Sequence, residues 1–523
     1  MPRKEQIRWK PRVRLTKAEE AICARCKRNG RLYAFLRRHR HELFDEAFQA
    51  ELAEMYADSA KGHPPVAPAL LAMVTVLQAV GGVSDEGAVN EAIFDRRWQM
   101  VLDCDGEGAP FSQGSLVAFR RRLIEQGLQE KLILQSVELA KKTGGFGFKQ
   151  LRVALDSAPL WGAGRVEDTF NLIGHALEIV AKCAASVADR TVNDVYEAAG
   201  MTLIGRSSVK AALDIDWDDK DEQHRALQEL LAEVIRLKQW LAAELNEEQL
   251  QSSPLREALE QLTRVIEQDL EPDPDRGGER ITRGTARDRQ ISISDPAMRH
   301  GRKSRSVTIK GFKRFIAREL DHGLILGVTI QGANQPEREA TPTLRRQVEV
   351  HGSTDALFID RGFLASNWTA DHYEAGGRVV CRPWMSRNGS RYAKRDFDID
   401  MARRVVTCPA GAMRPVNGNV VRFPKRACEP CQRREKCTRA KAGRTVSIHP
   451  QEPLLQDLTA RKKTPDGRAE LRERVPVEHS LAHICNRQGR HARYTGIDKN
   501  IFDLCRYAFI ENCFAIDRME RAA

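Results

Sequence analysis

Three acidic residues stand where a metal-dependent phosphoryl-transfer site would need them. Asp156 ends a stretch of alternating apolar residues, Asp360 ends the short apolar run 356–360, and Glu478 follows in a segment expected to be helical. Such alternation, and a short apolar run bounded by turn residues, are both typical of strands. In a mostly parallel sheet, neighbouring strand ends can bring two carboxylates together, and a helix crossing that edge can supply the third.

The chemistry expected of this set follows from the charge of its members. Three carboxylates held close together repel one another, which raises their pKa values. A pair of Mg²⁺ ions relieves this conflict, because Mg²⁺ prefers oxygen ligands and keeps water and phosphate oxygens in its shell. Two such ions can activate an attacking hydroxyl and stabilise the leaving oxygen of a phosphodiester. Each acid alone could equally be a helix cap, a turn residue or a surface residue, so the interpretation rests on the ordered set.

The elements that must position these acids are predicted from apolar periodicity. Helical spacing is present over residues 1–145, 173–270 and 501–519, whereas strand patterns occur at 148–156, 356–360 and 377–381. A hairpin is predicted with strands at 312–320 and 324–331, followed by a helix at 341–350. We therefore predict an α/β catalytic core with a mixed sheet and helices, together with an all-α N-terminal domain and a helical insertion.

The same patterns predict the domain boundaries. The helical N-terminal domain is expected to span residues 1–145, and the catalytic domain 146–172 and 283–523. The helical insertion is expected at 173–282, and a cysteine-containing insertion lies within the catalytic domain at 393–455.

The charge of the chain favours a polyanionic ligand. Lys and Arg number 84 against 72 Asp and Glu, a net charge of +12. Residues 214–280 hold 19 acidic and 8 basic residues, a charge of −11, so the remainder of the chain carries +23. A basic body with one acidic segment fits nucleic acid above all, although many soluble proteins are basic without binding DNA.

A cluster of arginines in the N-terminal domain is a candidate phosphate contact. A short turn followed by a helix is predicted near residue 111, with Ser115 as the N-cap. Arg120, Arg121 and Arg122 then crowd about one turn of that helix, which suits phosphate binding. A solvated basic helix face is the alternative interpretation.

The cysteines fit a reducing compartment and one candidate metal site. Twelve cysteines are spread through a long chain that shows no export signal, which argues against a disulfide scaffold. Cys408, Cys428, Cys431 and Cys437 could hold one tetrahedral Zn²⁺, with free thiols as the alternative. A second C-x-x-C motif, at residues 23–26, has no evident second half.

Several classes of protein are not supported. Apolar runs of membrane-spanning length are absent, and the N-terminus has no apolar region of the kind found in secretory signals. Neither a phosphate-binding G-x-x-x-x-G-K-[ST] motif nor a serine nucleophile motif occurs. We therefore expect a cytoplasmic protein with no membrane partner.

The chain resembles bacterial insertion-sequence transposases of the DDE class, most closely the insertion-sequence 1182 type, over nearly its whole length. Residues 62–71, 82–86 and 110–116 are similar to the helical N-terminal domain of that family. Residues 154–164 and 358–363 resemble the two aspartate motifs, and 295–304 and 309–314 the segments before the second strand. Residues 474–479 resemble the glutamate signature, in which an Arg precedes the Glu by four positions.

The resemblance implies an RNase H-like catalytic domain that cleaves transposon ends and joins them to target DNA. By this resemblance Asp156, Asp360 and Glu478 are the ligands of two Mg²⁺ (or Mn²⁺) ions, and Arg474 holds a DNA phosphate or orients the acid. Two positions depart from the family pattern, with Leu471 in place of a Tyr and Cys485 in place of a Lys. The remaining residues assigned to DNA contact are basic: Lys310, Lys313, Arg487 and Arg490.

The expected partners follow from the same family. They are double-stranded DNA, as terminal inverted repeats and target, and further copies of the chain in a homodimer or larger synaptic complex near the bacterial nucleoid. Two alternatives remain open from the residues: an RNase H-like nuclease without strand transfer, and a catalytically inactive, transposase-derived DNA-binding protein. Trp161, beyond the first aspartate, could stack on a flipped base, with core packing as the alternative.

Overall fold

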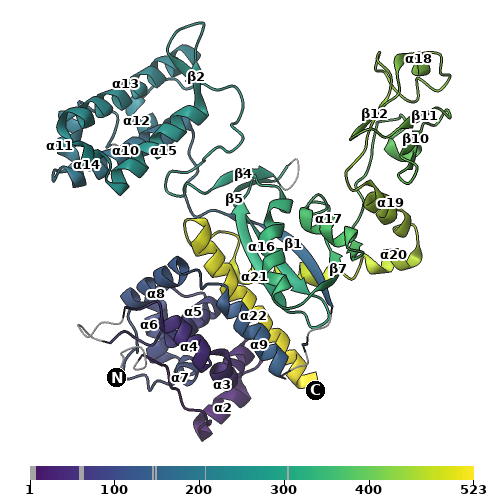
Figure 1. The fold of residues 1–523 in the computed structure, drawn as a ribbon. Helices are drawn as coiled ribbons and strands as arrows, with labels where there is room; N and C mark the ends of the chain where they lie inside the picture. The colour runs from purple at the N-terminus through teal and green to yellow at the C-terminus, as the bar shows by residue number, and fades with distance from the viewer. Residues whose placement is uncertain are drawn as a thin grey trace.

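The computed structural model describes residues 7–57, 64–143, 146–147, 150–205, 208–302 and 306–522. Parts of the sequence patterns above lie outside these ranges, among them Gly62, His63, Phe148, Lys149, Lys303 and Ser304. The chain forms a mixed α/β structure, which confirms the predicted class. Figure 1 shows a central sheet with helices around it and two segments that extend away from it.

The N-terminal part of the chain is helical. Its helices are α2 (Lys17–Arg25), α3 (Arg31–Leu43), α4 (Glu46–Ala53), α5 (Pro68–Gly81), α6 (Asp85–Phe94), α7 (Arg96–Leu102), α8 (Gln113–Glu125) and α9 (Lys131–Thr143). The prediction of Ser115 as the N-cap of α8 is wrong, because the helix already begins at Gln113. Ser112 is the N-cap: its backbone is extended, and its hydroxyl accepts a hydrogen bond from the Ser115 amide at 3.2 Å.

The central sheet contains six strands. They are β1 (Leu151–Trp161), β4 (Arg299–Arg302), β5 (Thr308–Glu319), β6 (Ile325–Gly332), β7 (Thr354–Phe358) and β8 (Arg378–Val380). The strand order is β6-β5-β1-β7-β8, and β4 pairs with the beginning of β5. β1, β7 and β8 are parallel, whereas β5 runs antiparallel to both β1 and β6. The predicted hairpin is therefore confirmed as β5–β6.

Helices from distant parts of the chain cover the sheet. They are α16 (Thr341–Glu349), α17 (Asn367–Glu374), α21 (Val475–Gln488) and α22 (Ile497–Ala522). α21 packs on β1, and α22 packs on β6 and on four of the N-terminal helices, α3, α5, α8 and α9. In Figure 1 the yellow α22 runs between the N-terminal helices and the sheet. The N-terminal helices and the sheet consequently share one hydrophobic core.

The predicted helical insertion between β1 and β4 packs on a core of its own. Its helices are α10 (Thr169–Val187), α11 (Val192–Ala198), α12 (Val209–Leu213), α13 (Lys220–Glu244), α14 (Glu247–Leu250) and α15 (Ser253–Asp269). The short strands β2 (Leu270–Pro272) and β3 (Glu279–Ile281) form a hairpin after α15. Both long helices, α13 and α15, pack against α10.

Only weak candidates for membrane spans occur among the described residues. α10 has the length and apolar composition of a span, and the pair α5–α6 qualifies only if its 97° bend is treated as a broken span. The apolar faces of α10 and α5 lie in the two larger hydrophobic cores. Burial in a core accounts for their composition, so a membrane protein is not indicated.

The cysteine-containing segment forms a third, small core. Its strands are β9 (Asp398–Asp400), β10 (Val405–Thr407), β11 (Met413–Pro415), β12 (Val420–Arg422) and β13 (Thr445–Ser447), with the short helix α18 (Lys425–Cys428). Helices α19 (Glu452–Arg461) and α20 (Pro465–Glu470) then lead towards α21. Figure 1 shows this green segment extending away from the central sheet.

Candidate active site

The two aspartates are positioned by neighbouring parallel strands. The register of β1 and β7 pairs Ala154 with Phe358, and Asp156 and Asp360 each lie two residues further along. β7 ends at Phe358, whereas β1 continues to Trp161. Asp156 is therefore placed on β1 just where its parallel neighbour has ended, and the exposed Asp360 follows that neighbour into a turn.

The glutamate reaches the same edge on α21. Arg474 precedes this helix, and its Nη1 donates a hydrogen bond to Glu478 Oε1 at 2.7 Å. Its Nη2 donates to Asp156 Oδ1, also at 2.7 Å. The four-residue spacing places Arg474 and Glu478 one helical turn apart, so one guanidinium can bind both acids. The structure thus brings Asp156 and Glu478 together through a shared arginine whose side chain is only 15% exposed.

The electrostatics of Asp156 place all three acids in one neighbourhood. Burial is the main cause that raises the pKa of Asp156 above its ordinary value, and the charges of Glu478 and Asp360 raise it further. Arg474 and the amide of Ser157 act in the opposite direction, and that amide donates to Asp156 Oδ1 at 2.9 Å.

The charge of Asp360 also affects the pKa of a neighbouring thiol, that of Cys381. Burial, with a smaller contribution from Asp360, raises the pKa of Cys381 to about 12. Cys381 directly follows β8, so its thiol stays neutral next to the acid. Asp360 is thereby placed between the ends of β1 and β8.

The donor set fits hard divalent cations in its chemistry. Carboxylate oxygens are the protein ligands that Mg²⁺ and Mn²⁺ prefer. Among the described residues, no group of three or more His, Cys, Asp or Glu side chains is already arranged to hold a metal ion. At the sheet edge the guanidinium of Arg474 binds two of the three carboxylates.

A fourth carboxylate lies at the same edge and was not found from the sequence. Glu337 begins a short 3-10 helix after β6, and its Oε1 accepts a hydrogen bond from the Ser157 hydroxyl at 2.5 Å. Its Oε2 fills the space next to Gly362, where a Cβ atom would come within 1.6 Å of it. Glu337 therefore contacts both segments that carry the aspartates. A single Glu after a strand has no distinctive spacing, which is why sequence reasoning missed it.

The structure assigns different surroundings to the three N-terminal arginines. Arg120 is buried, and its two Nη atoms donate to the carboxylate of Asp85 at 2.7 and 2.6 Å. Its guanidinium is thus used inside the helical core rather than presented to a ligand. Arg121 is exposed and lies 3.6 Å from Glu125, and Arg122 lies over the ring of Tyr56 at 4.6 Å.

The basic residues assigned to DNA contact around the sheet also differ in exposure and in their partners. Lys310 is exposed on β5, whereas Lys313 is half-buried and its Nζ donates to the carbonyl of Gln335 at 2.9 Å. Burial lowers the pKa of Lys313. Arg487 pairs with Glu511 and lies over Phe514, so part of its charge is already compensated.

Trp161 and Arg490 form a stacked pair at the end of β1. The guanidinium of Arg490 lies 4.0 Å from the centre of the Trp161 ring. The Trp161 amide donates to the Arg490 carbonyl at 3.0 Å, and the Ala492 amide donates to the Trp161 carbonyl at 2.6 Å. The loop after α21 is therefore tied to β1 beside the acids, with an exposed arginine on its surface.

Cys408, Cys428, Cys431 and Cys437 line one cavity. All are free thiols, as are Cys23 and Cys26. Cys23 contacts the sulfur of Met100 at 3.6 Å, and Cys26 ends α2.

Two segments of the chain match known protein families. Residues 19–122 match the family described as "Transposase domain (DUF772)". Residues 408–513 match the family described as "Transposase DDE domain". The two matches support an insertion-sequence transposase. No curated protein and no solved structure matches the chain.

The matched segments cover the helical N-terminal part and the region from the cysteines to α22. Glu478 and Arg474 lie inside the second segment. Asp156 and Asp360 lie between the two segments, so the family matches do not cover them and only the geometry of the sheet edge bears on their roles.

Proposed function

We propose that the chain is a DDE-type DNA transposase of the insertion-sequence 1182 type, which cleaves transposon ends and joins them to target DNA. The observation that carries the proposal is the meeting of Asp156 and Glu478 on Arg474, beside the strand end that bears Asp360. Two transposase family matches flank the aspartate-bearing strands and agree with it.

We infer an RNase H-like catalytic domain from the sheet. Its order β6-β5-β1-β7-β8, in which β5 is antiparallel to both β6 and β1 while β1, β7 and β8 are parallel, is the arrangement that we expect of such a core. The first two acids lie on the adjacent strands β1 and β7, and the third on a helix that packs on β1. This topology supports a site built at one edge from segments far apart in sequence.

The proposed roles follow from the surroundings of each residue. Asp156, Asp360 and Glu478 would hold two Mg²⁺ (or Mn²⁺) ions, which supply activation of the attacking hydroxyl and stabilisation of the leaving oxygen. Arg474 holds Asp156 and Glu478 in place and compensates their charge. Glu337 and Ser157 fix the two aspartate-bearing segments against each other.

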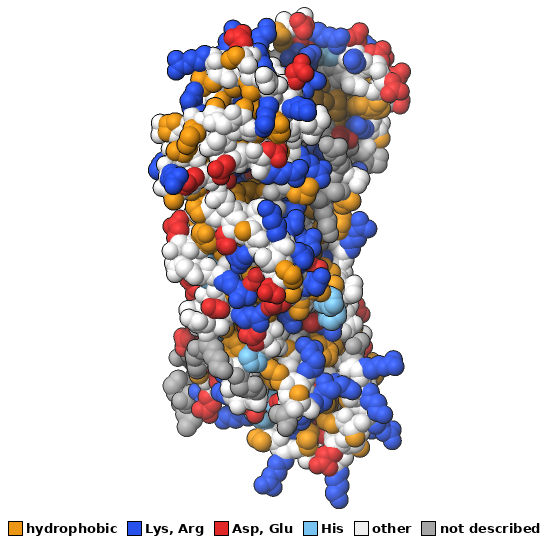
Figure 2. Space-filling view, turned by 90° about the vertical axis from the view of Figure 1, so that its right-hand side faces the viewer, with side chains coloured by type: hydrophobic (Ala, Val, Ile, Leu, Met, Phe, Trp, Pro, Cys, Tyr) orange, Lys and Arg blue, Asp and Glu red, His pale blue; other side chains and the backbone are white. Residues whose placement is uncertain are grey.

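The proposed partners are DNA and further copies of the chain. Exposed basic side chains near the site, including Lys310 and Arg490, are suited to phosphate contacts. Figure 2 shows Lys and Arg side chains spread over one face of the molecule, with acidic groups between them. Reactions at two transposon ends require both ends to be held together, so a dimer or larger complex at the bacterial nucleoid is proposed.

The test uses purified full-length protein and DNA that carries the inverted repeats flanking its reading frame. With Mg²⁺ we expect cleavage at the repeat ends and joined products, and with a chelator neither. Asp156→Asn, Asp360→Asn and Glu478→Gln should each reduce cleavage about a thousandfold, because several kcal/mol of charge stabilisation are lost and 1.4 kcal/mol is tenfold in rate. Asp355→Asn, at an exposed acid on β7, is the matched control.

Three outcomes would overturn the proposal in different ways. Cleavage that survives loss of the acids would remove them from the mechanism. Cleavage without joined products would indicate a nuclease. DNA binding that persists with no cleavage in any divalent metal would indicate an inactive DNA-binding protein, with an affinity that falls steeply with salt.

A further inference from the structure

The segment between β8 and α19 has a small apolar core. Its buried apolar residues are few: Phe397, Val406, Val416, Val421, Phe423, Val446 and Ile448. Each of its five strands is three residues long. Small units of this kind usually need a disulfide or a structural metal ion, because their surface is large relative to the core.

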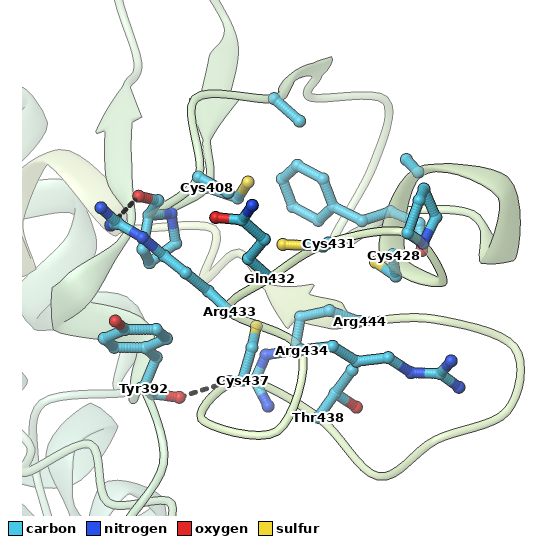
Figure 3. A pocket seen from close by; sticks show the side chains of 16 residues that line it. Tyr392, Cys408, Cys428, Cys431, Gln432, Arg433, Arg434, Cys437, Thr438 and Arg444 are labelled. Atoms are coloured by element: carbon cyan, nitrogen blue, oxygen red, sulfur yellow. Dashed lines mark hydrogen bonds between the residues drawn. The ribbon is translucent and has the colours of Figure 1, made fainter.

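The cysteines of this segment surround one cavity of about 430 Å³. Cys408 directly follows β10, Cys428 ends α18, and Cys431 and Cys437 lie on the loop after it. Figure 3 shows the side chains of Cys408, Cys431 and Cys437 around the same space, with Cys428 at its other side. Cys408, Cys428 and Cys437 also pack against the small core.

The backbone around the cysteines is folded into tight turns. The Gly411 amide donates to the Cys408 carbonyl at 2.8 Å, and the Cys431 amide donates to the Cys428 carbonyl at 3.3 Å. The Cys437 amide donates to the Arg434 carbonyl at 2.9 Å. Structural zinc sites likewise take their four ligands from short loops that are separate in sequence.

Arg444 also lines the cavity, where its Nε is buried without a hydrogen-bond partner. A metal ion would remove the mutual repulsion of four thiolates, and nearby arginines would compensate the charge of the resulting complex.

We propose that Cys408, Cys428, Cys431 and Cys437 bind one structural Zn²⁺ ion that holds this segment together. All four are free thiols, and soft sulfur ligands in a set of four select Zn²⁺. The four thiols line the cavity, but among the described residues they are not yet arranged to hold a metal ion, so the proposal requires them to move closer together when zinc binds. This inference does not depend on the proposed transposase activity.

The zinc ion would organise a strongly basic module. Residues 401–450 contain twelve Lys and Arg against two Asp and Glu, a net charge of +10. Such a charge density opposes compaction by self-repulsion, so a metal crosslink is needed to keep the cations on a defined surface. Arg433 and Arg434, which line the cavity, would be fixed directly by the metal-binding loop.

The first test measures zinc in full-length protein purified without chelator, by mass spectrometry of the metal. We expect about one zinc ion per chain in the wild type and a loss of most of it in Cys431→Ser and Cys437→Ser. Cys23→Ser is the matched control, because it disrupts the other C-x-x-C motif and should leave the zinc content unchanged. Wild-type zinc content in Cys431→Ser, or no zinc in the wild type, would overturn the proposal.

The second test requires no variant, so it holds even if the substituted chains do not fold. Replacing zinc by Co²⁺ should give the intense visible absorption of a tetrahedral site and a sulfur-to-cobalt band in the near ultraviolet. Chelation should open residues 401–450 to limited proteolysis while the central sheet stays resistant. A Co²⁺ spectrum without sulfur ligation, or cysteines that resist alkylation because they are paired in disulfides, would contradict a zinc site.

Discussion

At the scale of single residues, the positive charge of Arg474 compensates the negative charges of two acids of the candidate site. The guanidinium forms ion pairs with Asp156 and Glu478, each at 2.7 Å. A carboxylate that is mostly buried costs free energy unless it is paired, so Arg474 stabilises an arrangement that three acids alone would disfavour. The site is thus held in shape by its own cation and by the neighbouring Glu337.

Glu337→Gln tests whether this fourth carboxylate supports the three acids proposed to bind metal. The amide keeps the shape and can still accept the hydrogen bond from Ser157, but it removes one negative charge next to the aspartate-bearing segments. We expect the Mg²⁺ concentration for half-maximal DNA cleavage to rise about tenfold, the usual effect of losing a supporting group around a metal. Titration of cleavage against Mg²⁺ measures it.

Gly362→Ala is the companion variant for the same contact. Its added methyl group would meet Glu337 Oε2 and should push the carboxylate away, so both variants should raise the Mg²⁺ concentration for half-maximal cleavage. Glu339→Gln, at an exposed acid two residues along, is the control. Unchanged Mg²⁺ dependence in both variants would leave Glu337 with a purely structural role.

Residue type and order predicted the acids, but not what surrounds them. Asp156 and Asp360 could be singled out because a strand pattern precedes each, and Glu478 because it follows Arg474 at a helical spacing. Glu337 carries no such pattern, since its contact with Gly362 depends on how β6 leaves the sheet. Arg120 was predicted to contact DNA but is buried against Asp85. A run of three arginines in the sequence does not show which of them is buried.

At the scale of elements, ion pairs between helices fix the N-terminal part of the chain. Asp85 begins α6, and its carboxylate receives both Nη atoms of Arg120 on α8 and the side-chain amide of Gln78 on α5. Burial alone would raise the pKa of Asp85, but the hydrogen bonds from Arg120 and Gln78 outweigh it and lower the pKa. Three helices therefore depend on one ionised carboxylate.

The stability of this junction should depend on pH. The folded-state pKa of Asp85 lies below its value in the unfolded chain, so its contribution is present above the ordinary carboxyl pKa and is lost as the pH falls through the folded value. Asp85→Asn should lower the free energy of unfolding by about 1–3 kcal/mol at pH 7, because charged hydrogen bonds to a partly buried carboxylate are lost. The deficit should shrink progressively below about pH 4.

Urea unfolding of both proteins at a series of pH values measures this difference. Glu86→Gln, at the exposed next residue of the same helical turn, should be close to neutral throughout. A deficit for Asp85→Asn that stays constant down to pH 3 would contradict an ionised, arginine-bound Asp85.

Boundaries of elements were easier to predict than their packing. The hairpin β5–β6 and the helix α22 follow directly from alternation and from a long amphipathic stretch. The N-cap of α8 was misplaced by three residues because Ser112 and Ser115 both qualify by type, and only the backbone geometry distinguishes them. The shared core of the N-terminal helices and the sheet could not be predicted, since periodicity does not say which apolar faces meet.

At the scale of the whole molecule, a buried polar network connects the N-terminal helices to the sheet. Arg506 on α22 is fully buried, donates to the Thr75 carbonyl of α5 at 3.1 Å, and pairs with Asp503. Asp503 accepts from Gln488 of α21 at 2.9 Å, and Gln488 accepts from Arg314 of β5 at 2.6 Å. The chain's first and last parts are therefore coupled through side chains that cannot reach water.

Asp503→Asn should destabilise the N-terminal helices and the central sheet together. It leaves Arg506 buried without a counter-charge, and breaking a buried pair in this way costs about 3–5 kcal/mol. Because α22 belongs to the core shared by the N-terminal helices and the sheet, we expect faster amide hydrogen exchange in α5 and in β5 by similar factors. The double variant Asp503→Leu with Arg506→Met removes both charges and should be less damaging than Asp503→Asn alone. Faster exchange confined to α22, or a double variant that is worse than the single one, would show that this network does not couple the two parts.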